Sequence, residues 1–303
     1  MWRKRMIKKR LRKVRKNPGS LTAALICLLA VGMIAGCAAK KMPWGDPQTG
    51  LILKYRMDPG HSFQYKNETE VNQYMEVMGQ GIDVDTERTL TLTMTPKGNQ
   101  GENLLLAITI DSASLSINGP QGSMTPDMSE LEGESFDMTI NSIGEEIDVS
   151  GAEALQYEVE GEERSMSADF QMFFPDFAGK PVKMGDTWTT SGTLDIDEGS
   201  NQIKIDLESV NTLDGFEVIE GYECVRIKAN VTGTMEGEGE AQGMSLIMEG
   251  QGEGTDTWYF AYKEGILVKV ISEFYLDGNI DVTSANMSIP MKQEMKMTLS
   301  LVK

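Results

Sequence analysis

Few side chains in this sequence of 303 residues are suited to catalysis. His61 is the single histidine and lies in a Pro-Gly-His turn. A Ser-His-Asp hydrolase would have to use it, and the sequence has no Gly-x-Ser-x-Gly motif to carry the nucleophile. A zinc site needs about four Cys, His or carboxylate ligands, whereas the folded part supplies one histidine and one thiol, Cys224. We therefore predict that the protein is not an enzyme, and we expect neither a metal nor a cofactor.

Acidic residues suggest cation binding as a second kind of chemistry. Two Asp-x-Asp pairs and one alternating run of glutamates are candidates: Asp83/Asp85, Asp195/Asp197, and Glu236, Glu238 and Glu240. An EF-hand loop requires glycine at its sixth position and glutamate at its twelfth, and neither aspartate pair fits that pattern. The glutamates alternate within a glycine-rich stretch, which is typical of the solvated face of a hairpin.

Methionine is the unusual component, with 21 in the sequence. Six of them alternate with other residues in two strand-like runs: Met244, Met248, Met287, Met291, Met295 and Met297. Their flexible, polarisable side chains suit either an adaptable core or a lining for an apolar ligand, and thioethers also bind copper(I). We predict these six as ligand-binding residues, with core filling and metal binding as the alternatives.

The charge is distributed very unevenly along the chain. Residues 1–20 contain ten Lys and Arg residues and no acid, whereas the whole sequence has 28 basic and 46 acidic residues. Without residues 1–36, the net charge is -28. Such a surface repels nucleic acid and anionic headgroups, so we expect no nucleic-acid partner.

An apolar run follows the basic start and ends in Ile34-Ala35-Gly36-Cys37. The run from Leu21 to Gly36 has 16 residues, fewer than the roughly 20 that span a bilayer, and its end fits the A-x-A site of an ordinary secretory signal less well. It resembles the lipobox of bacterial lipoprotein signal peptides. The resemblance implies cleavage before Cys37 and a lipid on its thiol, and hence a membrane-anchored protein of the cell envelope. Ala38, at the position after the cysteine, favours the outer membrane if the cell has two membranes.

Alternation with period two dominates from Leu51 onward. Thr89–Met94, Leu104–Ile110, Ile203–Leu207, Val225–Val231 and Met287–Leu301 all follow it, separated by glycine-containing turn signals such as Lys97-Gly98, Asp214-Gly215 and Asp277-Gly278. We therefore predict an all-β fold of long, curved antiparallel sheets, half-barrel or barrel-like. Glycines between Val231 and Gly254 are expected to mark the curvature, and Cys224 is expected to be a small buried residue.

The sequence also predicts a domain organisation. Residues 1–36 form the signal peptide, 37–50 a flexible tether, 51–150 a first β module, 151–180 a connector with one or two short helices, and 181–303 a second β module. A faint repeat supports two similar modules, because Gly60-His-Ser-Phe63 resembles Gly185-Asp-Thr-Trp188. Phe63 and Trp188 would then be equivalent core anchors.

Pro181-Val-Lys-Met-Gly-Asp-Thr-Trp188 and Gly221-Tyr-Glu-Cys-Val-Arg-Ile227 resemble motifs of an uncharacterised family of envelope lipoproteins. These motifs belong to turns and strands and contain no catalytic group. The expected architecture is also loosely similar to the half-barrels of lipoprotein carriers. We therefore expect a binding or carrier module for an apolar or lipid-like ligand. The alternative is a structural or assembly lipoprotein that docks protein partners.

Overall fold

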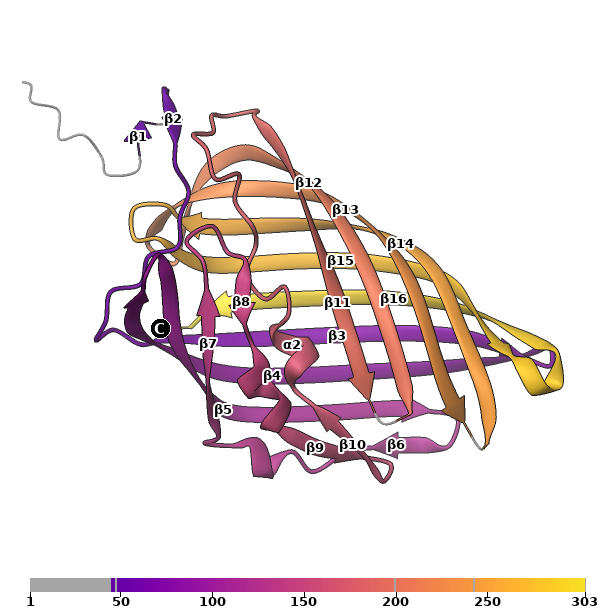
Figure 1. Cartoon of the computed structure of the whole chain (residues 1–303). Helices are drawn as coiled ribbons and strands as arrows, with labels where there is room; N and C mark the ends of the chain where they lie inside the picture. Colours follow the sequence, from indigo (N-terminus) through magenta and orange to yellow (C-terminus); the bar gives the residue numbers. More distant parts are fainter. Residues whose placement is uncertain (1–44, 47, 199, 242, 303) are drawn as a thin grey trace, which may run out of the picture. The chain divides into compact units, whose positions relative to one another are not determined.

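The computed structural model describes residues 45–46, 48–198, 200–241 and 243–302 (Figure 1). Cys37 and most of the predicted tether lie outside these residues. The strands are β1 Gly45–Asp46, β2 Gly50–Leu51, β3 Phe63–Val77, β4 Gln80–Gln100, β5 Asn103–Gly119, β6 Gly122–Met124, β7 Ser135–Ile140, β8 Glu146–Asp148, β9 Gln156–Val159, β10 Glu162–Ser165, β11 Thr187–Glu198, β12 Asn201–Ile219, β13 Tyr222–Ala241, β14 Met244–Ala261, β15 Ile266–Val282 and β16 Met287–Leu301. The short helices are η1 Ser129–Leu131, η2 Ser150–Ala154, α2 Ser167–Phe170 and η3 Thr283–Ala285.

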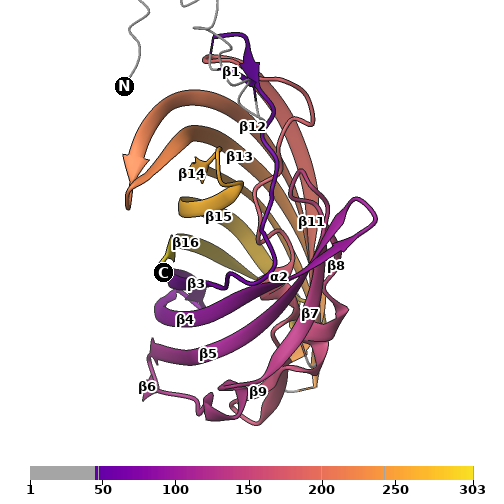
Figure 2. The ribbon, with the colours of Figure 1, turned by 90° about the vertical axis from the view of Figure 1, so that its left-hand side faces the viewer.

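One antiparallel sheet of 12 strands forms most of the described chain. Its order is β11-β12-β13-β14-β15-β16-β3-β4-β5-β7-β8, and β6 pairs with β5. The sheet is not closed, because β11 and β8 are its two edges. It curls, and Figure 2 shows β7, β8, β11 and α2 together on one side of the curved array. These findings confirm the predicted all-β fold of long, curved antiparallel strands with a short helical connector.

The ladder between β16 and β3 joins the two predicted modules into this sheet. It runs from Met291 opposite Met75 to Leu301 opposite Tyr65. Strands of residues 63–119 and of residues 187–301 therefore share one continuous hydrogen-bonded array. Their origin by duplication stays a prediction.

Alternation gives the sheet two distinct faces. The apolar face carries Leu90, Leu276, Met291 and the other residues in register with them, and its side chains are buried or half-buried. The polar face carries the residues in between, which are mostly exposed. This is the pattern of a sheet with one face toward a core and one toward water.

Several predicted turns are wrong. Lys97-Gly98 and Asp214-Gly215 lie at register shifts inside β4 and β12, and Asp277-Gly278 lies in the middle of β15. A glycine inside a strand that has neighbours on both sides bends the strand or allows close packing without ending it. The β3–β4 turn is instead Met78-Gly79, where both residues have positive φ (52° and 77°), and a two-residue hairpin of type I′ requires this.

The connector contains less helix than its sequence suggests. Its sequence indicates one or two short helices within residues 152–160 and 164–173, with a break at Gly161. The structure has the 3-10 helix η2, a hairpin of β9 and β10 that turns at Glu160-Gly161, and the four-residue helix α2. Glu160 and Gly161 both have positive φ, so the glycine closes a hairpin. Among the described residues, no helix is long and apolar enough to span a membrane.

The main core lies between the connector and one end of the apolar face. Connector residues such as Phe170 and Phe174 belong to the same buried cluster as Leu92 on β4 and Ile227 on β13. An ion pair between Arg88 and Asp169 joins β4 to α2 within this layer. The connector therefore covers one part of the apolar face and does not cover the rest of that face.

Candidate functional site

The six predicted methionines lie on the same face of the sheet, the apolar face. Met244 and Met248 lie on β14, the other four lie on β16, and β15 runs between these two strands. Met248 and Met291 are buried and belong to a second cluster with Met235 and Leu276. Met297 packs against the main core, while Met244, Met287 and Met295 are half-buried.

This second apolar cluster consists of Met235, Met248, Leu276 and Met291, with Met75, Ile203, Ile205, Phe274 and Ile280 packed against it. All of these residues belong to β3 and β12–β16, and none comes from the connector. Among the described residues, the hydrophobic side chains that pack in this cluster therefore all come from the sheet itself. The sequence analysis missed Met235 and Phe274, although both follow the same alternation on their strands.

Glycines of β13 and β14 form the floor beneath these side chains. A Cβ atom added to Gly252 would lie 2.4 Å from Cζ of Phe274, and one added to Gly237 would lie 3.2 Å from Cε of Met248. The glycines therefore provide room that aromatic and thioether side chains occupy. This explains the glycine-rich sequence between Val231 and Gly254 as close packing on a curved sheet.

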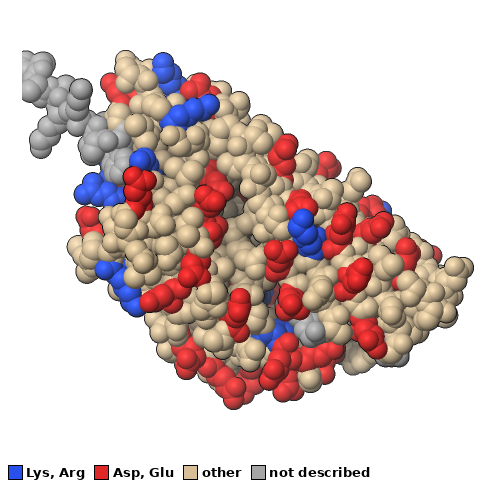
Figure 3. Space-filling view, in the orientation of Figure 1, with Lys and Arg blue, Asp and Glu red and all other residues tan. Residues whose placement is uncertain are grey.

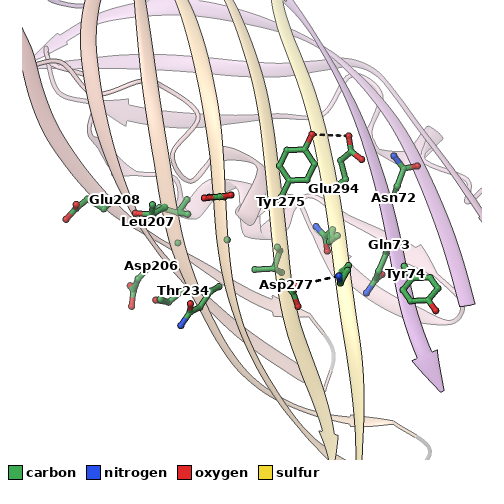
Figure 4. A pocket seen from close by; sticks show the side chains of 18 of the residues that line it. Asn72, Gln73, Tyr74, Asp206, Leu207, Glu208, Thr234, Tyr275, Asp277 and Glu294 are labelled. Atoms are coloured by element: carbon green, nitrogen blue, oxygen red, sulfur yellow. Dashed lines mark hydrogen bonds and ion pairs between the residues drawn. The ribbon is translucent and has the colours of Figure 1, made fainter. Parts of the chain in front are cut away.

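A hollow of about 1230 Å³ extends across eight neighbouring strands, from β11 to β4. It is lined mainly by polar-face residues, several of which Figure 4 labels on β12, β15, β16 and β3. The sequence analysis did not predict it, because its residues are far apart in sequence and meet only through the register of the strands. None of the six methionines lines it.

The charge of this hollow is strongly negative. Seven carboxylates line it together with one basic residue, Lys292: Asp83, Asp85, Asp206, Glu208, Glu253, Asp277 and Glu294. The Lys292 ammonium lies 3.8 Å from the Asp277 carboxylate, and the Tyr275 hydroxyl donates to Glu294 at 3.4 Å. Tyr74 and Tyr275 are exposed and add two aromatic rings. Figure 3 shows acidic side chains scattered widely over the face it presents, with fewer basic ones.

A smaller hollow of about 610 Å³ lies near the ends of β11–β14. Its lining includes Met248, Ile203 and Ile247, together with the acidic residues Asp195 and Glu236. Met248 is thus the one predicted methionine that borders either of these two hollows. The glutamate run of the sequence contributes Glu236 and Glu238 to the same lining.

The single histidine and the one thiol of the described residues lie apart from these features. Cys224 is fully buried as predicted, and burial raises the pKa of its thiol to about 11. His61 is exposed in the turn before β3. In the part of the chain that the structure describes, no group of three or more His, Cys, Asp or Glu side chains is arranged to hold a metal ion.

Comparisons with known proteins give only distant similarity. No family model matches the chain, and no curated protein matches it significantly. The structure is similar to Pseudomonas aeruginosa OccK2 (OpdF), with 10% identity over 81% of this chain and 99% of that one, and a TM-score of 0.26. A Bacteroides fragilis protein described as exported, with a YmcC-like fold, gives 10% identity over 82% and 97% and a TM-score of 0.24. A DUF1329 family protein from Desulfovibrio piger gives 11% identity over 78% and 85% and a TM-score of 0.14. TM-scores this low carry no argument about function.

Proposed function

We propose that this chain is a lipid-anchored, non-enzymatic protein of the cell envelope that binds an apolar ligand, such as an acyl chain, on its apolar face. The observation that carries the proposal is the second apolar cluster, which continues the apolar face beyond the residues that the connector covers. Cys37 supplies the anchor in this proposal.

The chemistry of the cluster suits a ligand of variable shape. Methionine has three rotatable bonds and fits irregular apolar partners without strain. Met235 and Met248 lie over glycines, so their side chains can move without displacing another side chain beneath them. An acyl chain that replaced them would bury apolar surface, at roughly 25 cal/mol per Å².

Binding of a fluorescent fatty acid to the detergent-solubilised full chain tests this proposal. Met248→Glu and Met291→Glu place charges in the second cluster and should reduce the affinity at least tenfold. Met184→Glu is the matched control, because Met184 is exposed before β11 and outside the cluster. If the parent protein does not bind, or if all three variants bind equally, the methionines only fill a core.

A specific observation favours a second candidate, which is docking of a cationic protein segment. Seven carboxylates and one lysine line the hollow of about 1230 Å³, and exposed tyrosines beside them can contact cations through their rings. Such binding should weaken as salt rises, because screening reduces attraction between exposed charges.

Binding of a lysine-rich peptide at increasing salt separates this candidate from the first. Asp206→Lys and Glu253→Lys should reduce peptide binding and leave fatty-acid binding unchanged. Glu132→Lys, an exposed acid outside the hollow, is the control for net charge. Equal loss in all three variants would indicate only nonspecific attraction to an acidic surface.

A further inference from the structure

One short segment of the connector contacts both open edges of the sheet. The side-chain amide of Gln171 accepts a hydrogen bond from the backbone N–H of Asp195 on β11 at 2.8 Å and donates one to its carbonyl at 3.0 Å. Three residues later, the backbone N–H of Phe174 donates to the carboxyl of Glu146 on β8 at 2.8 Å. Residues 171–174, here termed the clasp, therefore link β11 to β8 across the open side of the sheet.

The Gln171 contact has the form of a ladder bond. An amide that donates to and accepts from one residue of an edge strand does what a neighbouring strand would do at that position. Within the described ranges, β11 pairs with β12 and with no second strand on this side. The clasp thus substitutes for the strand that would close the sheet.

Two carboxyl groups beside the clasp, those of Glu146 and Asp176, lie in surroundings that disfavour their ionisation. Glu146 is half-buried, and Asp176 follows the clasp by two residues. The Oδ1 atom of Asp176 is buried and has no hydrogen-bond partner among the described residues. The indole N–H of Trp188 donates to the Asp176 backbone carbonyl at 3.1 Å, and the Tyr55 hydroxyl donates to that of Pro175 at 3.0 Å. These two bonds hold the backbone of Pro175 and Asp176 in place, and with it the Asp176 side chain.

Neighbouring groups make ionisation still harder. Burial, and then the charge of Asp176, raise the pKa of Glu146 to about 7, although hydrogen bonds from the backbone lower it in part. Burial and then the charge of Glu145 raise the pKa of Asp176 to about 6. Tyr55, in the segment before β3, also interacts with the pair, because its own pKa is raised by burial and then by Glu146, by Tyr65 on β3 and by Asp176. The charges that act most on the pair are therefore negative.

We propose that residues 171–174 form a pH-responsive clasp, closed while Glu146 and Asp176 are neutral and released when both are ionised. A neutral carboxyl still accepts the Phe174 N–H bond, whereas two half-buried carboxylates repel each other and are partly deprived of the water that stabilises their charge. Moving the clasp outward hydrates both groups. It also moves Phe173 and Phe174 away from Phe170 and from the rest of the main core, with which they pack.

The direction of the pH dependence follows from the difference in carboxyl pKa between the closed and the released clasp. A carboxyl with a raised pKa favours the closed state at low pH, and this preference is lost as the pH rises through the folded-state value. The gap between about 7 and the usual 4.5 lets Glu146 alone change the opening equilibrium by at most about 300-fold, and the raised pKa of Asp176 adds to this change. The inference stands whether or not the apolar face binds a ligand.

Amide hydrogen exchange of the detergent-solubilised full chain tests the clasp, with exchange times scaled for the intrinsic effect of pH. From pH 5.5 to pH 8, opening at Phe174 and Asp195 should increase at least tenfold in the parent protein. The double variant Glu146→Gln/Asp176→Asn should show no such increase. Glu153→Gln, an exposed acid on η2, should behave like the parent.

Two outcomes would overturn the proposal: equal opening at both pH values in the parent, or a pH-dependent increase that persists in the double variant. Gln171→Ala keeps the test decisive if the double variant does not fold. It should raise exchange at Asp195 already at pH 5.5 and leave the centre of β14 protected. Unchanged exchange at Asp195 in Gln171→Ala would show that the edge needs no clasp.

Discussion

The ring of Phe274 on β15 lies directly over Gly252 on β14, so that a Cβ atom at position 252 would meet its Cζ atom at 2.4 Å. The same ring lies over Gly254, where the corresponding distance to Cδ2 is 2.7 Å. One aromatic side chain therefore depends on two glycines of the neighbouring strand. This contact marks where the apolar face passes from the main core to the second apolar cluster, because Phe274 packs against both.

Gly252→Ala should lower the free energy of unfolding by about 1–3 kcal/mol, the usual cost of overpacking. Urea denaturation measures it. Gly119→Ala is the matched control, since a Cβ there meets Val84 at 3.7 Å, an ordinary contact. Gly252→Ala/Phe274→Leu should recover part of the loss. Equal stability of Gly252→Ala and Gly119→Ala would contradict the packing argument.

Trp188→Ala should destabilise the protein by roughly 3–5 kcal/mol, because Trp188 is 7% exposed within the main core. It also removes the indole bond to the Asp176 carbonyl. Phe63 is half-buried at the edge of that core, so Phe63→Ala should cost less. The denaturation midpoint is the measurement, and an unchanged midpoint in Trp188→Ala would remove Trp188 from the core.

Stability should fall as the pH rises from 5.5 to 8. The folded-state pKa values of Glu146 and Asp176 are raised to about 7 and about 6, so their contribution is complete below the usual pKa values of these groups and is lost as the pH passes the raised ones. Carboxyls with lowered pKa values, such as Asp206 and Asp214, act oppositely and only in more acidic solution. Thermal denaturation of the parent and of Glu146→Gln measures the slope, which should flatten in the variant. A slope that is the same in both would show that Glu146 does not set it.

Cys37→Ala should abolish incorporation of radiolabelled palmitate and release the protein from membranes, because the lipobox resemblance places the lipid on this thiol. Cys224→Ala is the control, since Cys224 is buried in the fold and should not change labelling. Persistent labelling of Cys37→Ala would contradict lipidation at this position.

The sequence by itself determined the class of the fold and the faces of its strands. Strict alternation in Met287–Leu301 or Ile203–Leu207 has one physical solution, a strand with one buried side, and the structure has it. The sequence also placed the six methionines on strand faces and predicted that Cys224 is buried.

Tertiary structure decided where the strands end and which of them meet. Lys97-Gly98 and Asp214-Gly215 look locally like turns, but the ladder with β5 carries β4, and the ladder with β13 carries β12, through them as bulges. Register alone brings Asp206 of β12 and Asp277 of β15 to one hollow, because long-range pairing leaves no trace in either segment. The contacts of Gln171 with Asp195 and of Glu146 with Phe174 likewise exist only because the sheet stays open and the connector crosses its gap.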